Sequence, residues 1–244
     1  KFDNESKELG NWYVGQKQGE IWGYETYGLF QSEQEIAGAA NQDKVSGGIK
    51  LMPGDIRFVD RNNDGVIDWG DNTVDNPGDK KIIGNSTPRY HYGINLGADW
   101  KGFDLGIFFQ GVGKRDLYLP GTSFRSHYGS EWQVPSAYNN DYWTEENTGA
   151  YFPRARFNGG SAINQAQTRY MVDASYCRLK SVSIGYTLPK VLTQKASIEK
   201  IRIYFTGENL FTISDTPDGL DPELDNPYTY PMQRSLSVGL SLTF

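Results

Sequence analysis

Cysteine and histidine are nearly absent from this chain of 244 residues. The single cysteine, Cys177, excludes an internal disulfide framework and zinc sites built on several cysteines. The two histidines, His91 and His127, leave little for a histidine-based metal centre or a catalytic triad. Because neither His127 nor Cys177 lies near a motif that would activate a nucleophile, we interpret Cys177 as a small strand residue.

Long apolar runs are also absent, and the mean hydropathy is −0.61. No run of 18 apolar residues exists and no signal peptide opens the chain, so a membrane-spanning helix is excluded. A membrane barrel is not excluded, because its strands are only half apolar. Basic residues are in deficit, and the net charge of −6 argues against nucleic acid as a partner.

Tyrosine, tryptophan and glycine are abundant, with 16 Tyr, 6 Trp and 28 Gly. This composition indicates an all-β protein with long loops. The length permits one or two domains. Many carboxylates are present, but none stands in a recognisable acid–base pair. We therefore predict no catalytic residue and no enzyme.

The last eleven residues, 234–244, alternate between apolar and small polar side chains. A strand turns alternate side chains to opposite faces, so one face is apolar and the other is small and polar. A tilted strand of about 9–11 residues spans a bilayer. The apolar positions are Leu236, Val238, Leu240, Leu242 and Phe244.

Four further segments show the same alternation. Trp100 and Phe103 flank a two-residue connection containing Gly102, which predicts a tight hairpin with aromatic residues at the membrane interface. The predicted strands are residues 90–100, 103–112, 178–188 and 198–209.

Connections between the five strands are short, long, short and long in turn. Outer-membrane barrels have short periplasmic turns and long extracellular loops. Five strands do not close a barrel, and the chain begins at Lys1, so we expect a piece of something larger. The predicted segments are an extracellular loop region (1–89), a transmembrane hairpin (90–112), a long extracellular loop (113–177), two transmembrane strands joined by a periplasmic turn (178–209), an extracellular loop (210–233) and a C-terminal transmembrane strand (234–244).

Residues 60–71 fit the twelve-residue calcium loop. Gly65 stands at position six, where the loop turns, and Ile67 at position eight is apolar and suited to anchor the loop on a core. An Asn/Asp/Gly turn that needs no ion is the alternative. We predict a structural Ca²⁺, with Mg²⁺ left open, bound by side chains and one carbonyl of Asp60, Asn62, Asp64, Val66, Asp68 and Asp71.

Two sets of side chains have both a structural and a functional interpretation. Seven aromatics in residues 128–152 either pack on one another or stack on sugar rings and pack against a lid. Charges predicted on the inner face of the strands either pair across strands or touch a plug or solute. The aromatics are Tyr128, Trp132, Tyr138, Tyr142, Trp143, Tyr151 and Phe152, and the charges are Asp99, Asp104, Arg202 and Glu208.

Several longer stretches occur together in one order: GEIWGYETYGLFQS (19–32), PGDIRFVDRNNDGVID (53–68), IGNSTPRYHYGINLGADWKGFDLGIFFQG (83–111), DYWTEENTGAYFPR (141–154), DASYCRLKSVSIGYTLP (173–189), IRIYFTGENLFTIS (201–214), GLDPE (219–223) and RSLSVGLSLTF (234–244). In these stretches the chain resembles the C-terminal part of SusC/RagA-family TonB-dependent outer-membrane transporters of Bacteroides-like bacteria.

That resemblance implies a 22-stranded antiparallel β-barrel in the bacterial outer membrane, in contact with its lipid. It also implies an N-terminal plug and a SusD-like lipoprotein lid. The family imports oligosaccharides or peptides, driven by TonB. The plug, the TonB-contacting part and the remaining strands are expected to lie outside this chain. The sequence names no individual substrate residue.

Two other functions compete with transport. A soluble, calcium-stabilised β-sandwich that binds carbohydrate would explain the calcium loop, the aromatics and the acidity, but not the segregated loop lengths. A hydrolase would need a placed pair of carboxylates, which the sequence does not show.

Overall fold

The computed structural model describes residues 5, 7–118, 141–156, 160–194, 197–217, 220–224, 229–230 and 232–244. The chain divides into two compact units, each built from two separate stretches of sequence. The first unit is Lys1–Thr87 with Asp116–Val172, and the second is Pro88–Arg115 with Asp173–Phe244.

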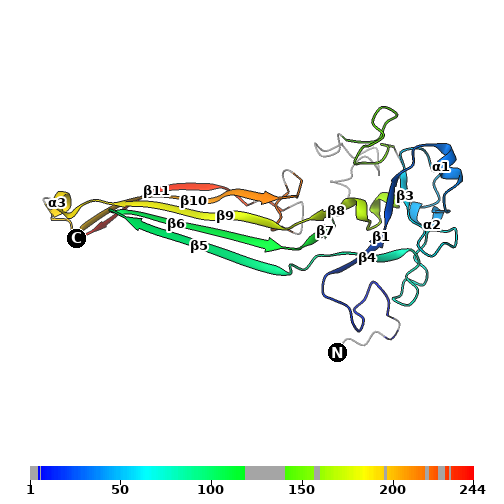
Figure 1. Cartoon of the computed structure of the whole chain (residues 1–244), viewed down its shortest axis with the longest axis horizontal. Helices are drawn as coiled ribbons and strands as arrows, with labels where there is room; N and C mark the ends of the chain where they lie inside the picture. The colour runs from blue at the N-terminus through cyan, green and yellow to red at the C-terminus, as the bar shows by residue number, and fades with distance from the viewer. Residues whose placement is uncertain are drawn as a thin grey trace. The chain divides into compact units, whose positions relative to one another are not determined.

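The second unit is built on one antiparallel sheet of five long strands, which lie side by side in Figure 1. Their order across the sheet is β11-β10-β9-β6-β5. Between β9 and β10 lies a short helix, α3 (Lys190–Thr193). The strands are β5 (Tyr90–Trp100), β6 (Phe103–Gly113), β9 (Tyr176–Thr187), β10 (Lys200–Ser214) and β11 (Ser235–Thr243).

The hairpin between β5 and β6 turns on two residues with positive φ, Lys101 (φ 47) and Gly102 (φ 90). Positive φ at both central positions is the geometry that fits the twist of a two-residue hairpin. A Cβ added at Gly102 would lie 2.8 Å from the Thr187 carbonyl oxygen, so the close approach to β9 also requires glycine. The tight hairpin expected from the sequence is confirmed.

A β-bulge interrupts the sheet in β9. Phe108 pairs with Ser181 and Phe109 pairs with Leu179, so Lys180 has no partner in β6. On the other side of β9 the register shifts between Glu208 and Phe211. A bulge turns neighbouring side chains away from strict alternation. Strand β10 continues beyond this shift to Ser214, whereas the sequence pattern predicted its end at residue 209.

The first unit contains short paired strands and helices around its own core. Strand β1 (Glu20–Tyr24) pairs with β4 (Lys80–Asn85), and β2 (Thr26–Leu29) pairs with β3 (Ile56–Phe58). The remaining elements are α1 (Glu33–Ala37), α2 (Asp43–Ser46), two 3₁₀ turns (Ala162–Asn164 and Thr168–Tyr170) and the strand pair β7 (Asp116–Tyr118) and β8 (Met171–Asp173).

The core of the first unit gathers side chains from both of its sequence stretches. Tyr24, Phe30, Ile56 and Ile67 come from the earlier stretch and Tyr170 from the later one, and all are 1% exposed or less. Each large apolar side chain buried in this way contributes about 1.5–3 kcal/mol. Among the described residues no helix is long and apolar enough to cross a membrane.

Candidate functional site

One face of the five-stranded sheet is apolar along its length, because residues paired directly across strands share a face. We call this surface the apolar face. Three of its rows across the sheet are Trp100–Phe103–Tyr186–Ile203–Leu240, Ala98–Leu105–Ile184–Phe205–Val238 and Leu96–Ile107–Val182–Gly207–Leu236.

The apolar face is open in this chain. Ile184 is 47% exposed, Leu240 60% and Val238 78%. An exposed apolar surface larger than a few hundred Å² marks an interaction or membrane site. Covering each such side chain with an apolar medium is worth up to about 1.5–3 kcal/mol. A β-sandwich would cover this face with a second sheet, and the described part of the second unit contains only one sheet.

The opposite face, which we call the polar face, carries small and polar side chains in matching rows. One row is Gly97–Gly106–Ser183–Thr206–Ser237 and another is Asp99–Asp104–Gly185–Tyr204–Gly239. Because these side chains are small, the polar face leaves room for water beside the sheet. This arrangement suits a hydrated interior.

The charges on the polar face pair across strands. Arg202 Nε donates to Asp104 Oδ1 at 2.9 Å, and Nη2 donates to Oδ2. The pair joins β10 to β6 across β9, where a Cβ at Gly185 would overlap both partners. Ser235 Oγ donates to Glu208 Oε2 at 3.1 Å. Of the two interpretations of these charges, the structure favours cross-strand pairing for Asp104, Arg202 and Glu208.

A buried ionic cluster holds the loop after β10 against the sheet. Arg178, whose side chain is 3% exposed, lies 2.6 Å through Nη2 from Asp221 Oδ1, and Nη1 lies 3.4 Å from Glu223 Oε1. Lys180 Nζ lies 3.4 Å from Glu223 Oε2. Arg115 Nη1 donates to the Pro222 carbonyl at 2.8 Å. We call the five charged residues of this group the loop-anchoring cluster: Arg115, Arg178, Lys180, Asp221 and Glu223.

Asp221 is the most constrained acid of this cluster. Burial raises the pKa of its carboxyl, but hydrogen bonds from Arg178 and from the backbone N–H groups of Glu223 and Met232 outweigh burial, so the net pKa is lowered. The sequence analysis missed this cluster as a site. Its signals were Lys180, which breaks the apolar alternation of β9, and the GLDPE stretch that supplies both acids.

The carboxylates of the predicted calcium loop accept hydrogen bonds from the loop's own backbone. Asp60 accepts from the N–H groups of Asn63 and Gly65 at 2.7 and 2.8 Å. Asp64 Oδ1 accepts from the Val66 N–H at 2.8 Å, and Asp64 Oδ2 accepts from Asn62 Nδ2 at 2.8 Å. These bonds fix a tight turn. Ile67, as expected, is fully buried.

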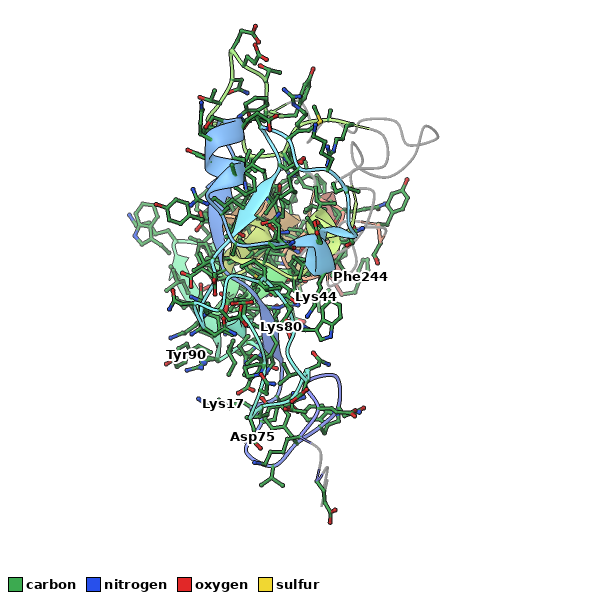
Figure 2. The ribbon with its side chains drawn as sticks, turned by 90° about the vertical axis from the view of Figure 1, so that its right-hand side faces the viewer. Lys17, Lys44, Asp75, Lys80, Tyr90 and Phe244 are labelled. Atoms are coloured by element: carbon green, nitrogen blue, oxygen red, sulfur yellow. The ribbon has the colours of Figure 1, made fainter. Side chains whose placement is uncertain are left out.

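The two later acids of the loop, Asp68 and Asp71, contact side chains from outside residues 60–71. Lys44 Nζ (labelled in Figure 2) lies 2.7 Å from Asp68 Oδ2, and this contact, followed by the Gly70 N–H, lowers the pKa of Asp68. Asp71 Oδ2 accepts from Asn76 Nδ2 at 2.9 Å. In the described residues, which include all of the loop, no three His, Cys, Asp or Glu groups converge to hold a metal. Calcium binding stays a prediction.

The described aromatics of the 128–152 stretch pack within the first unit. Trp143 and Phe152 are 3% and 4% exposed, and Arg154 stacks 4.8 Å from the Trp143 ring. Tyr151 contacts Tyr170 edge-on at 5.4 Å. Packing is therefore the role the structure supports for these residues, while Tyr142 is 38% exposed. Tyr128, Trp132, Tyr138 and also His127 lie outside the described residues.

Comparison with known proteins defines the class. No family model matches the chain. TonB-dependent receptor P3 of Formosa agariphila is 31% identical over 94% of this chain, which corresponds to 22% of that receptor. A structure of the RagAB peptide transporter matches 96% of this chain and 24% of that chain, with a TM-score of 0.68 and 22% identity.

The fold and these relatives define a portion of a TonB-dependent receptor, a class of outer-membrane β-barrel proteins. Within that class the chain is similar to SusC of Bacteroides thetaiotaomicron, with 29% identity over 77% of this chain and 17% of SusC. The resemblance to the SusC/RagA family, the all-β class and the outer-membrane location are confirmed. The chain spans about a quarter of the length of the relatives it matches, which are receptors and transporters rather than enzymes.

Proposed function

We propose that this chain forms part of the wall and outer loops of a TonB-dependent importer of oligosaccharides or peptides. The observation that carries the proposal is the sheet with one exposed apolar face and one small, polar face. A barrel wall needs this division, because one face meets lipid and the other meets the interior.

The two outer strands of the sheet support a larger barrel. Among the described strands, β5 and β11 each pair with one neighbour only. An exposed strand edge leaves backbone N–H and C=O groups without partners, which is untenable within a bilayer. Further strands of the same receptor, to a total of 22 on the family pattern, would close the barrel on both edges.

The loop lengths support an orientation in the membrane. The turn at residues 101–102 and the connection at 188–199 face the periplasm, and residues 1–89, 113–177 and 210–233 lie outside the cell. The compact first unit, with its own core, then belongs to the extracellular part of the receptor.

The names of the relatives support the proposed substrate class, lid and energy supply. One structural relative is a peptide transporter by its title, and the sequence relatives are TonB-dependent by name. We propose that the receptor works with a SusD-like surface lipoprotein and contacts TonB through the part outside this chain.

We also propose that the loop at residues 60–71 binds Ca²⁺ as a staple of the extracellular unit. The support is the agreement of six positions with the calcium pattern and the buried Ile67 that anchors the loop. Asp68 is paired with Lys44, and Asp71 accepts a hydrogen bond from Asn76. The ion would therefore first bind the other four ligands, which are Asp60, Asn62, Asp64 and the Val66 carbonyl.

Uptake by whole cells tests the transport proposal. Cells with and without the full receptor are given labelled oligosaccharides or labelled peptides, before and after the proton-motive force is dissipated. We expect one substrate class to enter only when the receptor and the proton-motive force are both present. Unchanged uptake of both classes would contradict the proposal. Recovery of the protein as a detergent-free soluble monomer would favour the carbohydrate-binding alternative.

A further inference from the structure

A hollow of about 300 Å³ opens in the first unit, between β2, β3, α1 and two later segments of the chain. All of its lining residues are described, and all belong to this unit. Its volume lies at the lower end of the range for small-ligand sites. We call it the arginine hollow. Its polar and aromatic lining residues are Tyr27, Gln31, Glu35, Arg57, Thr148 and Arg169.

A β-bulge places Tyr27 in the lining of the arginine hollow. Thr26 pairs with Phe58 and Gly28 pairs with Arg57, so Tyr27 is the extra residue of β2. Gly28 has φ 145, a conformation that residues with a Cβ rarely adopt. Bulges re-aim side chains and are over-represented beside functional sites. Here the bulged residue is a tyrosine that is 72% exposed.

Aromatic rings, and no acid of the described residues, hold the Arg57 side chain. Its guanidinium carbon lies 4.4 Å from the centre of the Tyr27 ring and 5.8 Å from the centre of the Phe30 ring. Among the described residues no ion pair or side-chain hydrogen bond is found for Arg57. Stacking on a ring leaves the N–H groups of a guanidinium available, in a fork that matches a carboxylate.

Arg169 and Glu35 add one further charge of each sign to the lining. Arg169 Nε donates to the Tyr151 carbonyl at 2.8 Å and Nη2 donates to the Ala150 carbonyl, so the backbone holds this side chain. Glu35 Oε2 accepts from the Gln31 N–H at 2.9 Å. In the part of the chain that the structure describes, Glu35 pairs with neither arginine. Two arginines against one glutamate leave the hollow positive, although the whole chain carries −6.

This lining suits a ring that carries both a carboxylate and hydroxyl groups. An unpaired guanidinium binds a carboxylate through two parallel hydrogen bonds. The second carboxylate oxygen of Glu35 can accept from a sugar hydroxyl, and the Thr148 hydroxyl can donate or accept. The exposed Tyr27 ring offers an apolar surface to the C–H groups of a sugar. An acidic peptide would match the arginines, but its carboxylates lack neighbouring hydroxyls for Glu35 and Thr148.

We propose that the arginine hollow binds a uronic acid unit of an oligosaccharide. Arg57 and Arg169 bind the carboxylate. Glu35 accepts from a ring hydroxyl, and Tyr27 contacts the ring. The inference rests on the proposed function, because it takes the first unit to be extracellular and oligosaccharides to be the imported class. It adds a binding site on that unit and a preference for acidic sugars.

Isothermal titration calorimetry of the full receptor in non-ionic detergent tests this site. The probes are the trimers of galacturonate, glucuronate and mannuronate, together with the methyl ester of each trimer, which lacks the charge. We expect at least one trimer to bind. Its methyl ester should bind at least about tenfold more weakly, because hydrogen bonds to charged groups are stronger than those to neutral ones. This comparison uses the unmodified receptor, so it does not depend on the folding of any variant.

Substitution of Arg57 locates the binding. Arg57→Gln should weaken binding of the trimer at least about tenfold, because both the charge and the fork are lost. Arg154→Gln is the matched control. Arg154 is also half-buried and lies 4.8 Å from an aromatic ring, that of Trp143, but it does not line the hollow. Both variants are compared at equal melting temperature.

Three results would overturn the inference: no binding of any trimer, equal binding of a trimer and its ester, or equal affinity of the two variants. Displacement of the trimer by an equal concentration of triglutamate would assign the hollow to acidic peptides instead. These results are separate from a failure of transport, because the titration needs no proton-motive force. Uptake that does not depend on the receptor would contradict the proposed function whatever the hollow binds.

Discussion

At the scale of single residues, Gly185 decides whether the polar face can hold its ion pair. Arg202 and Asp104 meet across β9 directly over Gly185, where a Cβ would overlap both side chains. We expect Gly185→Ala to lower the melting temperature of the folded receptor, because a Cβ at this position would displace both charged partners. Gly106→Ala is the matched control, since a Cβ at Gly106 meets nothing within 4 Å. Thermal unfolding of the two variants in detergent measures the difference, and equal melting temperatures would contradict the argument.

Asp60 and Asp64 decide whether the 60–71 loop binds calcium. If it does, Ca²⁺ stabilises the first unit by about 2.7 kcal/mol at a concentration one hundred times the dissociation constant. We expect Asp60→Asn with Asp64→Asn to abolish the rise in melting temperature that Ca²⁺ produces. Asp75→Asn is the control, because Asp75 is an exposed partner of Lys7 (Asp75 is labelled in Figure 2). A melting temperature that does not respond to Ca²⁺ in the unmodified receptor would show an ion-free turn.

The sequence predicted the calcium pattern but not the partners of its acids. Local spacing places Asp60, Asn62 and Asp64 on one turn, because they are consecutive alternate residues. Lys44, which pairs with Asp68, comes from α2 and reaches the loop only through the packing of the first unit. Contacts of this kind depend on tertiary structure, and no local pattern reports them.

At the scale of elements, the strands followed from alternation wherever alternation was unbroken. Strand β5 has the predicted bounds, and β6 ends one residue later. Strand β10 was predicted too short because the register shifts after Glu208, where Asn209 has φ 50. The alternation resumes out of phase at Phe211, so a strict period of two loses the strand at that point.

The loop-anchoring cluster should make the loop after β10 sensitive to acid. The pKa of Asp221 is lowered in the folded protein, so the ionised carboxylate stabilises the loop. This stabilisation is fully present at pH values above the ordinary pKa of an aspartate, and it is lost as the pH falls through the lowered pKa of the folded state. We expect Asp221→Asn to destabilise the anchored loop by about 3 kcal/mol, because it leaves Arg178 buried without its partner.

Hydrogen exchange at the Glu223 and Met232 amides measures this effect, since both donate to Asp221. Protection factors, which correct for the intrinsic pH dependence of amide exchange, should fall in Asp221→Asn, and should fall in the unmodified receptor on acidification. The exposed Asp215 provides the control substitution, Asp215→Asn. Exchange that is the same in both variants would show that the cluster does not hold the loop.

At the scale of the whole molecule, the proposed function requires the sheet to have one lipid face and one interior face. Ile184 and Ser183 are neighbours in β9 with side chains on opposite faces. Placing Arg on a lipid face costs about 2–4 kcal/mol near the bilayer midplane. We expect Ile184→Arg to lower the free energy of unfolding in lipid vesicles by an amount between about 1 kcal/mol, the cost near an interface, and that midplane value, because Ile184 lies one row from the interfacial aromatics. Ser183→Arg should change it little. Equal effects would contradict the division.

The whole-molecule arrangement was predictable only in part. Alternation and loop lengths indicated a membrane sheet, because both are written in short stretches of sequence. The compact first unit was predicted merely as loop, since its core joins residues such as Tyr24 and Tyr170 that are far apart in the chain. Its short strands also carry too few residues to show a period.

The most direct test of the central claim is a quenching measurement on two single-cysteine labels in the full receptor in vesicles. A fluorophore is attached at Ile184→Cys or at Ser183→Cys, with Cys177→Ser in the background. Lipid-borne nitroxide should quench the label at residue 184, and aqueous iodide should quench the label at residue 183. Quenching of both labels by iodide and of neither by nitroxide would contradict a lipid-facing sheet.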